Sequence, residues 1–203
     1  LQSSWNNIPQ VTQFDQSDIT VLDNYRKTIS KEKKMSFLPF FMKALIPVLK
    51  EFPDFNSSLN SNKNTLILKK YFNIGIAIDT PYGLIVPVIK DIDKKDIFSI
   101  MNELSDISQR AQNKKIKPPE LQGSCITISS LGGIGGTNFT PIVNPPEVAI
   151  IGISKASIRP YYNGKKFEPR KILPLSLTYD HRVIDGAVAA RFTTLFCKYL
   201  TNY

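Results

Sequence analysis

Runs of β-branched residues alternate along this chain with segments of helical periodicity, and this order limits the possible folds more than any other feature. Strand-like runs fill most of the region from Thr65 to Asp91 and return three times between Ser124 and Asp180. Apolar positions three and four residues apart indicate helices before, between and after these runs. The order predicts an α/β fold, a two-layer sandwich of a mixed β-sheet with helices on one face.

Four segments have the periodicity of amphipathic helices. Ser17 or Asp18 can cap the N-terminus of the first helix. The third helix has its last apolar position at Ala111, and we expect this helix to cover one face of the sheet. In the second, Pro39 suits the first turn, whereas Pro47 should kink the helix. The predicted helices cover residues 17 to about 34, 37–52, 97–111 and 186–200.

The strand-like runs are separated by short turn signals. The turn TPYG at residues 80–83 predicts a hairpin, and Asn163-Gly164 predicts a second one. Residues 56–64 are polar and typical of a turn. The predicted strands cover residues 65–79, 83–91, 124–131, 146–156 and 171–180.

Length and composition indicate a single compact catalytic domain without a membrane-spanning segment. The 203 residues carry a net charge of +9, largely from short lysine clusters beside apolar segments. Such clusters are usually solvated surface, and they lack the interleaved aromatics of a nucleic-acid site, so we expect no nucleic-acid partner. An anionic small molecule such as a polyphosphate cofactor is a better match for the charge. No apolar run reaches the ~20 residues that cross a bilayer.

Cysteine and histidine usage points away from disulfides and metal sites. Cys125 and Cys197 each lie in an apolar stretch, outside any CxxC spacing, which favours buried free thiols and a cytoplasmic protein. With one histidine and no cluster of ligands at metal spacing, no metal site is expected.

The single histidine, His181, follows the last predicted strand in the run DHRVIDG. A loop between a strand and a helix can hold a side chain rigidly at a cleft, and a neutral imidazole can take a proton from a thiol or hydroxyl near pH 7. A structural histidine is the alternative. Asp185 could cap the last helix or pair with Arg182 or Arg191, and Asp180 and Arg182 could form a similar local pair.

The run LSLTYDHRVIDGAVAARF resembles the acyltransferase cores of the 2-oxoacid dehydrogenase complexes, which have a chloramphenicol acetyltransferase-like fold. FNSSLN, IGIAIDTPYGLIVPVIKD, TISSLGGIGGTNFTPIVNPPEVAIIGISK and NGKKF are similar too, in the same order, from about Ile8 onward. The sequence of the long glycine-containing run resembles the acetyltransferases of pyruvate dehydrogenase complexes more than the other branches of the family. The resemblance implies one acyltransferase catalytic domain over residues 1–203, with the family's lipoyl and peripheral-subunit-binding domains absent from this chain.

The same resemblance implies roles for individual residues. His181 matches the family's general base, Ser129 the hydroxyl that stabilises the tetrahedral oxyanion, and Asp185 the second marked residue of HxxxDG. In the implied reaction, an acetyl group passes between S-acetyldihydrolipoamide and coenzyme A. Ser130 competes with Ser129, because alternation along a strand points the two hydroxyls to opposite faces.

Further residues are expected to line the substrate channel. Asn56, Ser57 and Asp79 match segments that contact coenzyme A or the lipoyl group in the family. Gly132 and Gly133 belong to a glycine-rich loop in which Asn138 occupies the third glycine position of GxGxxG, so a tight loop beside the channel is expected instead of a phosphate site.

The resemblance also implies assembly. The family forms trimers in which His181 and Ser129 would come from different chains. The bacterial type of this sequence favours a 24-subunit cubic core over a dodecahedron. The implied partners are the pyruvate dehydrogenase and dihydrolipoyl dehydrogenase components, and the lipoyl group would sit on a domain outside this chain. Two alternatives stay open: a core acyltransferase for another acyl group or acceptor, and an oligomeric scaffold without activity.

Overall fold

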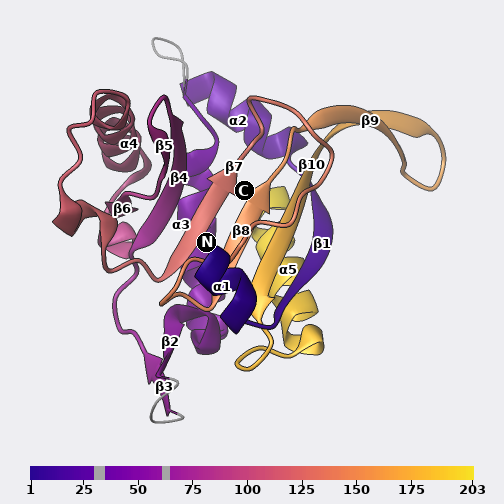
Figure 1. Cartoon of the computed structure of the whole chain (residues 1–203). Coiled ribbons are helices and arrows are strands. Elements are labelled where there is room, and N and C mark those ends of the chain that lie inside the picture. The colour runs from indigo at the N-terminus through magenta and orange to yellow at the C-terminus, as the bar shows by residue number, and fades with distance from the viewer. Residues whose placement is uncertain (30–34, 61–64) are drawn as a thin grey trace.

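Among residues 1–29, 35–60 and 65–203, which the computed structural model describes, eight strands join in one main sheet (Figure 1). In sheet order the path is β1 (Gln10–Asp18), β10 (Phe167–Asp180), β8 (Ala149–Ile153), β7 (Ile126–Ser130), β4 (Ile74–Thr80) and β5 (Gly83–Ile85). In addition, β6 (Val88–Ile89) pairs with β4, and β9 (Ser157–Tyr162) pairs with β10. A separate two-stranded sheet contains β2 (Ser57–Asn60) and β3 (Thr65–Leu68).

The main sheet is mixed, as the sequence predicts. β7 pairs in parallel with β4 on one side and with β8 on the other, whereas β1 and β8 each pair with β10 antiparallel. The crossover from β4 to β7 passes through α4 (Ile97–Gln112), and the crossover from β7 to β8 is the loop of residues 131–148. Parallel strands require such long connections, and each crossover can carry site residues at its ends.

The long helices cover one face of this sheet. They are α2 (Thr20–Ile29), α3 (Leu38–Glu51), α4 and α5 (Gly186–Thr201), while the short α1 (Gln2–Asn7) lies on the opposite face (Figure 1). Short 3-10 turns occur at Pro53–Asn56, Ile92–Lys94 and Pro118–Leu121. This arrangement is the two-layer sandwich expected from the sequence.

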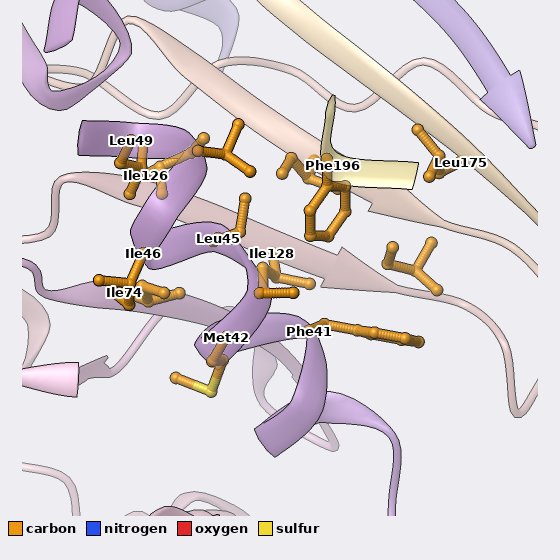
Figure 2. Close-up of a cluster of buried hydrophobic side chains, with 14 of the residues drawn as sticks. Phe41, Met42, Leu45, Ile46, Leu49, Ile74, Ile126, Ile128, Leu175 and Phe196 are labelled. Atoms are coloured by element: carbon orange, nitrogen blue, oxygen red, sulfur yellow. The ribbon is translucent and has the colours of Figure 1, made fainter. Parts of the chain in front are cut away.

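The core lies between α3 and the sheet. Leu45 and Leu49 of α3 share one stripe, since residues four apart lie on the same side of a helix. In Figure 2 they belong to the same buried cluster as Ile126 and Ile128 of β7 and Phe196 of α5. The packing of α3 and α5 on the central strands fixes the positions of the strand ends, where the site residues lie.

Three predicted helices are confirmed and one needs a new beginning. The first starts at Thr20, not Ser17, because residues 10–18 form the edge strand β1. An oxygen of Asp18 accepts a hydrogen bond from the Thr20 N–H at 2.9 Å, so Asp18 caps the helix. Residues 30–34, the predicted end, lie outside the described residues. The second helix continues through Pro47 to Glu51, and its kink stays a prediction.

The predicted strand at 65–79 is wrong as a single element. β3 ends at Leu68 and β4 begins at Ile74, because the Asn56 side-chain amide bonds the carbonyls of Lys69 and Tyr71 and holds that segment in a turn. The polar residues 57–60, predicted as a turn, form β2 instead, and residues 61–64 lie outside the described part. The run at 83–91 is likewise divided, into β5 and β6.

Both predicted hairpins are confirmed. β4 pairs with β5 across Thr80–Gly83, and β9 pairs with β10 across a turn in which Gly164 has a φ of +91°. Cys125 and Cys197 are buried free thiols, as predicted. Within the described ranges, no helix is long and apolar enough to cross a membrane.

Candidate active site

The loop from β10 to α5 presents His181 on the molecular surface. The His181 N–H donates to the Pro9 carbonyl at 2.9 Å, and the imidazole lies 5.8 Å from the buried ring of Tyr179. The side chain itself is exposed. The main chain is therefore fixed at this position while the imidazole remains open to a partner molecule.

A short-range ion pair braces the same loop. The Asp180 carboxylate is 2% exposed and accepts from the Arg182 backbone N–H at 3.0 Å, from Nε at 2.9 Å and from Nη2 at 2.7 Å. This carboxylate raises the pKa of Arg182 above its usual value. The predicted local pair of Asp180 and Arg182 is confirmed.

The predicted contacts of Asp185 are wrong for this chain. Asp185 occupies the N-cap position of α5, but its side chain makes no capping hydrogen bond. Arg182 is engaged by Asp180, and within the described ranges no ion pair joins Asp185 to Arg182 or Arg191. The exposed Asp185 carboxylate lies near Tyr179, whose pKa is raised by burial and, secondarily, by the charge of Asp185.

Ser129 and Ser130 end the parallel strand β7. Ile126 and Ile128 belong to the core under the helices, so alternation directs Ser129 to the opposite face and Ser130 to the helix side. Ser129 lies in register between Ala77 of β4 and Gly152 of β8. The two hydroxyls thus have different surroundings, as the alternation predicted.

Two cavities of about 510 and 490 Å³ adjoin at Ser130, Ser36 and Leu38, which line both. Gly132 and Gly133 line the first cavity and Asp79 lines the second. The structure therefore brings three predicted channel residues to the same end of the sheet as Ser129. The first cavity also has basic side chains, namely Arg26, Lys155 and Lys171.

Asn56 and Ser57 lie at the end of the main sheet opposite to Ser129, and their side chains form hydrogen bonds within their own chain. The Asn56 amide donates to the carbonyls of Lys69 and Tyr71, and the Ser57 hydroxyl donates to the Asp54 carbonyl at 2.6 Å. Both side chains are buried. Only Oδ1 of Asn56, which has no partner in the described residues, is left for a further contact.

The sheet register separates His181 from Ser129. Ser129 is level with Gly152, and Gly152 is level with Ser176 of β10. His181 lies five residues beyond Ser176 and two strands away, which gives about 16 Å along the sheet and about 10 Å across it, or roughly 19 Å in all. One acyl carbon cannot be within ~3 Å of both side chains of the same chain.

Sequence reasoning missed Glu147, a buried carboxyl beside β7. It is 3% exposed, and its Oε1 accepts from the Thr127 hydroxyl at 2.8 Å and from the Asn144 amide at 3.3 Å. Burial raises its pKa to about 7. Its position fastens the end of the 131–148 loop to β7, two residues from Ser129, and a glutamate inside the apolar run at 146–153 was the available signal.

Within the described ranges, no three His, Cys, Asp or Glu side chains are grouped so that they could hold a metal ion. One end of the main sheet thus carries the exposed imidazole of His181. The other end carries the hydroxyls of Ser129 and Ser130 beside two cavities, both lined by Ser130.

Known structures identify the class to which this fold belongs. A solved chloramphenicol acetyltransferase superposes with a TM-score of 0.65 at 17% identity, over 99% of this chain and 93% of that one. The fold is therefore that of the chloramphenicol acetyltransferase-like proteins. Residues 1–203 match the family model of the 2-oxoacid dehydrogenases acyltransferase (catalytic domain), and the chain belongs to this family.

Individual relatives are similar over nearly the whole chain. A dihydrolipoyllysine-residue acetyltransferase component of the pyruvate dehydrogenase complex from Pseudomonas aeruginosa is 56% identical over 198 residues, which are 95% of this chain and 36% of the relative. This chain thus spans about a third of that protein. The Azotobacter vinelandii dihydrolipoamide acetyltransferase structure has a TM-score of 0.96 at 51% identity, over 100% of this chain and 85% of that one. A cubic core of a pyruvate dehydrogenase multienzyme complex has a TM-score of 0.96 at 52% identity, with the same coverage.

Proposed function

We propose that this chain transfers an acetyl group between S-acetyldihydrolipoamide and coenzyme A, as the catalytic core of a pyruvate dehydrogenase complex. The observation that carries the proposal is the spacing of three residues. The A. vinelandii structure comes from work on the catalytic roles of a serine, a histidine and an asparagine, and the serine precedes the histidine by 52 positions while the asparagine follows it by four. Ser129, His181 and Asp185 have the same spacing.

His181 acts as the general base. Its neutral imidazole takes the proton of the coenzyme A thiol, and the thiolate attacks the thioester carbonyl carbon of S-acetyldihydrolipoamide. The tetrahedral intermediate collapses by breaking the bond from carbon to the dihydrolipoyl sulfur. That sulfur receives the proton from the His181 imidazolium, which leaves acetyl-CoA and dihydrolipoamide.

Ser129 stabilises the intermediate. Negative charge on the carbonyl oxygen is greatest in the tetrahedral state, and a hydroxyl already placed to donate to it lowers the barrier by roughly 2 to 4 kcal/mol. The spacing favours Ser129 over Ser130, whose side chain faces the cavities on the helix side. Asp185 stands at the position of the relative's asparagine, at the N-cap of α5 beside the loop that carries His181.

The reacting site is composed of two chains. The separation of roughly 19 Å between His181 and Ser129 supports this, since neither group can serve the other within one chain. Of the candidate residues, His181, Asp185, Asn56 and Ser57 would come from one copy, and Ser129, Asp79, Gly132 and Gly133 from its neighbour. A homotrimer, built into a 24-subunit core like the cubic core of the similar structure, fulfils this requirement.

The remaining parts of the proposal concern the surroundings of the core. The lipoyl group would be delivered by a lipoyl domain, and the partner enzymes would be the pyruvate dehydrogenase and dihydrolipoyl dehydrogenase components. Two buried free thiols suit a reducing compartment, which supports a cytoplasmic location as part of the proposal.

The test is thiol-acetyl exchange between acetyl-CoA and dihydrolipoamide. His181→Ala should lower the exchange rate at least ~100-fold, because a positioned general base contributes 10²–10⁴-fold, with assembly unchanged in sedimentation. Lys198→Ala, in the last turn of α5, is the matched control and should retain the full rate. Full activity in His181→Ala overturns the mechanism. Preference for a hydroxyl acceptor such as chloramphenicol over dihydrolipoamide overturns the substrate assignment.

A further inference from the structure

A row of small residues crosses the main sheet at the level of Ser129. Ala77 of β4 is in register with Ser129, Ser129 with Gly152 of β8, and Gly152 with Ser176 of β10. The residue before each of the last three belongs to the core under the helices, so this row faces away from the helices. The row therefore brings two hydroxyls to the same face of the sheet, with only a glycine between them.

The hydroxyl of Ser176 is buried without a hydrogen bond. Ser176 is 1% exposed, and its Oγ has no partner among the described residues. Thr178, the next residue on the same face of β10, is also buried, but its hydroxyl lies 2.8 Å from the Thr12 hydroxyl. A buried hydroxyl without a partner costs free energy, and folded chains retain few of them. The Ser176 hydroxyl therefore needs a reason to be there other than stability.

Gly152 allows this hydroxyl to lie over β8. A Cβ on residue 152 would overlap Oγ of Ser176, and it would lie 2.9 Å from Cζ of Phe139. The Ser176 side chain thus leans from β10 toward β8, which is the direction of Ser129. The half-buried ring of Phe139 covers the same place. A larger residue at position 152 would displace the Ser176 hydroxyl from this place.

The distance left between the two hydroxyls fits a bridging water. Neighbouring strands lie ~4.8 Å apart, so Cβ of Ser129 is roughly 5 Å from the point over Gly152 that the Ser176 side chain reaches. Within the described part of the chain, no hydrogen bond joins the two hydroxyls directly. Two hydrogen bonds of ~2.8 Å to one water span such a distance.

We propose that Ser176 is a positioning residue for Ser129. Its hydroxyl donates, through one water held beside Gly152, to the Ser129 oxygen. A Ser129 oxygen that accepts this hydrogen bond keeps its own hydrogen for the oxyanion, and hydrogen bonds in such a chain strengthen one another. The inference rests on the proposed function, in which the Ser129 hydroxyl donates to the tetrahedral intermediate.

The test compares the two buried hydroxyls of β10 in the exchange assay and in urea unfolding. Ser176→Ala should lower kcat about tenfold, as expected for one lost hydrogen bond, with KM changed less than about twofold. Thr178→Ala, on the same strand and face, is the matched control and should retain the wild-type kcat. Stability should change in the opposite sense: Ser176→Ala should be at least as stable as wild type, whereas Thr178→Ala loses the bond to Thr12 and should be less stable.

A double-mutant cycle in kcat shows whether Ser176 acts through Ser129. In the Ser129→Ala background, Ser176→Ala should lower kcat by less than about twofold, because the hydroxyl that it positions is gone. A merely structural role would instead lower kcat by the same factor in both backgrounds. Should Ser176→Ala fail to fold, Ser176→Cys, a weaker donor of similar size, takes its place with the same expected kinetics.

Equal factors in the two backgrounds overturn the inference, and so does a wild-type kcat in Ser176→Ala. Either result leaves the proposed function intact as long as Ser129→Ala itself is slow. A fully active Ser129→Ala overturns the proposed role of Ser129, and the inference with it.

Discussion

Glu147 makes the stability of this protein depend on pH in a defined direction. Burial raises the pKa of its carboxyl from the usual 4.5 to about 7, and hydrogen bonds from Thr127, Ser124 and Asn144, with the charge of Lys69, oppose this shift only partly. Oε2 has no partner among the described residues. Near pH 5 to 6 the folded chain therefore binds a proton here that the unfolded chain lacks.

The sign and size follow from linkage. Because the folded state binds the extra proton, the free energy of unfolding decreases as pH rises from about 4.5 to about 7, and then no longer changes on account of this group. One pKa unit corresponds to about 1.4 kcal/mol, so the total change is on the order of 3 kcal/mol. Glu147→Gln keeps an oxygen to accept from Thr127 and has no charge to bury.

Urea unfolding at pH 5 and pH 7.5, at one fixed protein concentration, measures this effect. The wild type should lose about 2 kcal/mol of stability between the two values, relative to Glu147→Gln, because most of the change falls in this pH range. Glu51→Gln, which alters an exposed carboxyl at the end of α3, is the control and should retain the wild-type pH dependence. Equal pH dependence in the wild type and Glu147→Gln would refute the reasoning.

Three further predictions concern the site and the core. Ser129→Ala should lower kcat in the exchange assay about 100- to 1,000-fold, whereas Ser130→Ala should change kcat less than about tenfold; the reverse order would assign the oxyanion to Ser130. Asp180→Ala leaves Arg182 unpaired and frees the His181 loop, so kcat should fall about 100-fold with little change in KM; an unchanged kcat contradicts the positioning role. Phe192→Ala removes a ring stacked on Phe55 with centroids 4.0 Å apart, and it should lower the free energy of unfolding in urea by about 3–5 kcal/mol. Phe98→Ala, at a half-exposed side chain, should lower it by less than ~0.5 kcal/mol. Similar losses in the two variants would contradict the packing.

The sequence predicted elements whose signal is local. α4 and α5 have strong helical periodicity over 16 residues each, and β8 is a continuous apolar run, so their types follow from neighbouring residues. β1 escaped notice because its residues alternate between partial burial and exposure and are mostly polar. Its place is determined by pairing with β10, more than 150 residues away, which no local pattern reveals.

The candidate site was predictable in its parts but not in its arrangement. His181 was found from its loop and from the resemblance, and Ser129 from the resemblance alone. Their separation depends on the order of β10, β8 and β7 in the sheet, which periodicity does not specify. Glu147 was missed because its role depends on a loop that folds back onto β7.

The central claim, that each site joins His181 of one copy to Ser129 of another, is tested most directly by mixing two inactive variants. His181→Ala and Ser129→Ala are purified separately, dissociated, combined in equal amounts and reassembled, with assemblies mixed without dissociation as the control. Random assembly places an intact Ser129 opposite an intact His181 in roughly one quarter of the sites. The account predicts that the reassembled mixture regains roughly a quarter of wild-type exchange activity while the control stays at background. A reassembled mixture that also stays at background would contradict it.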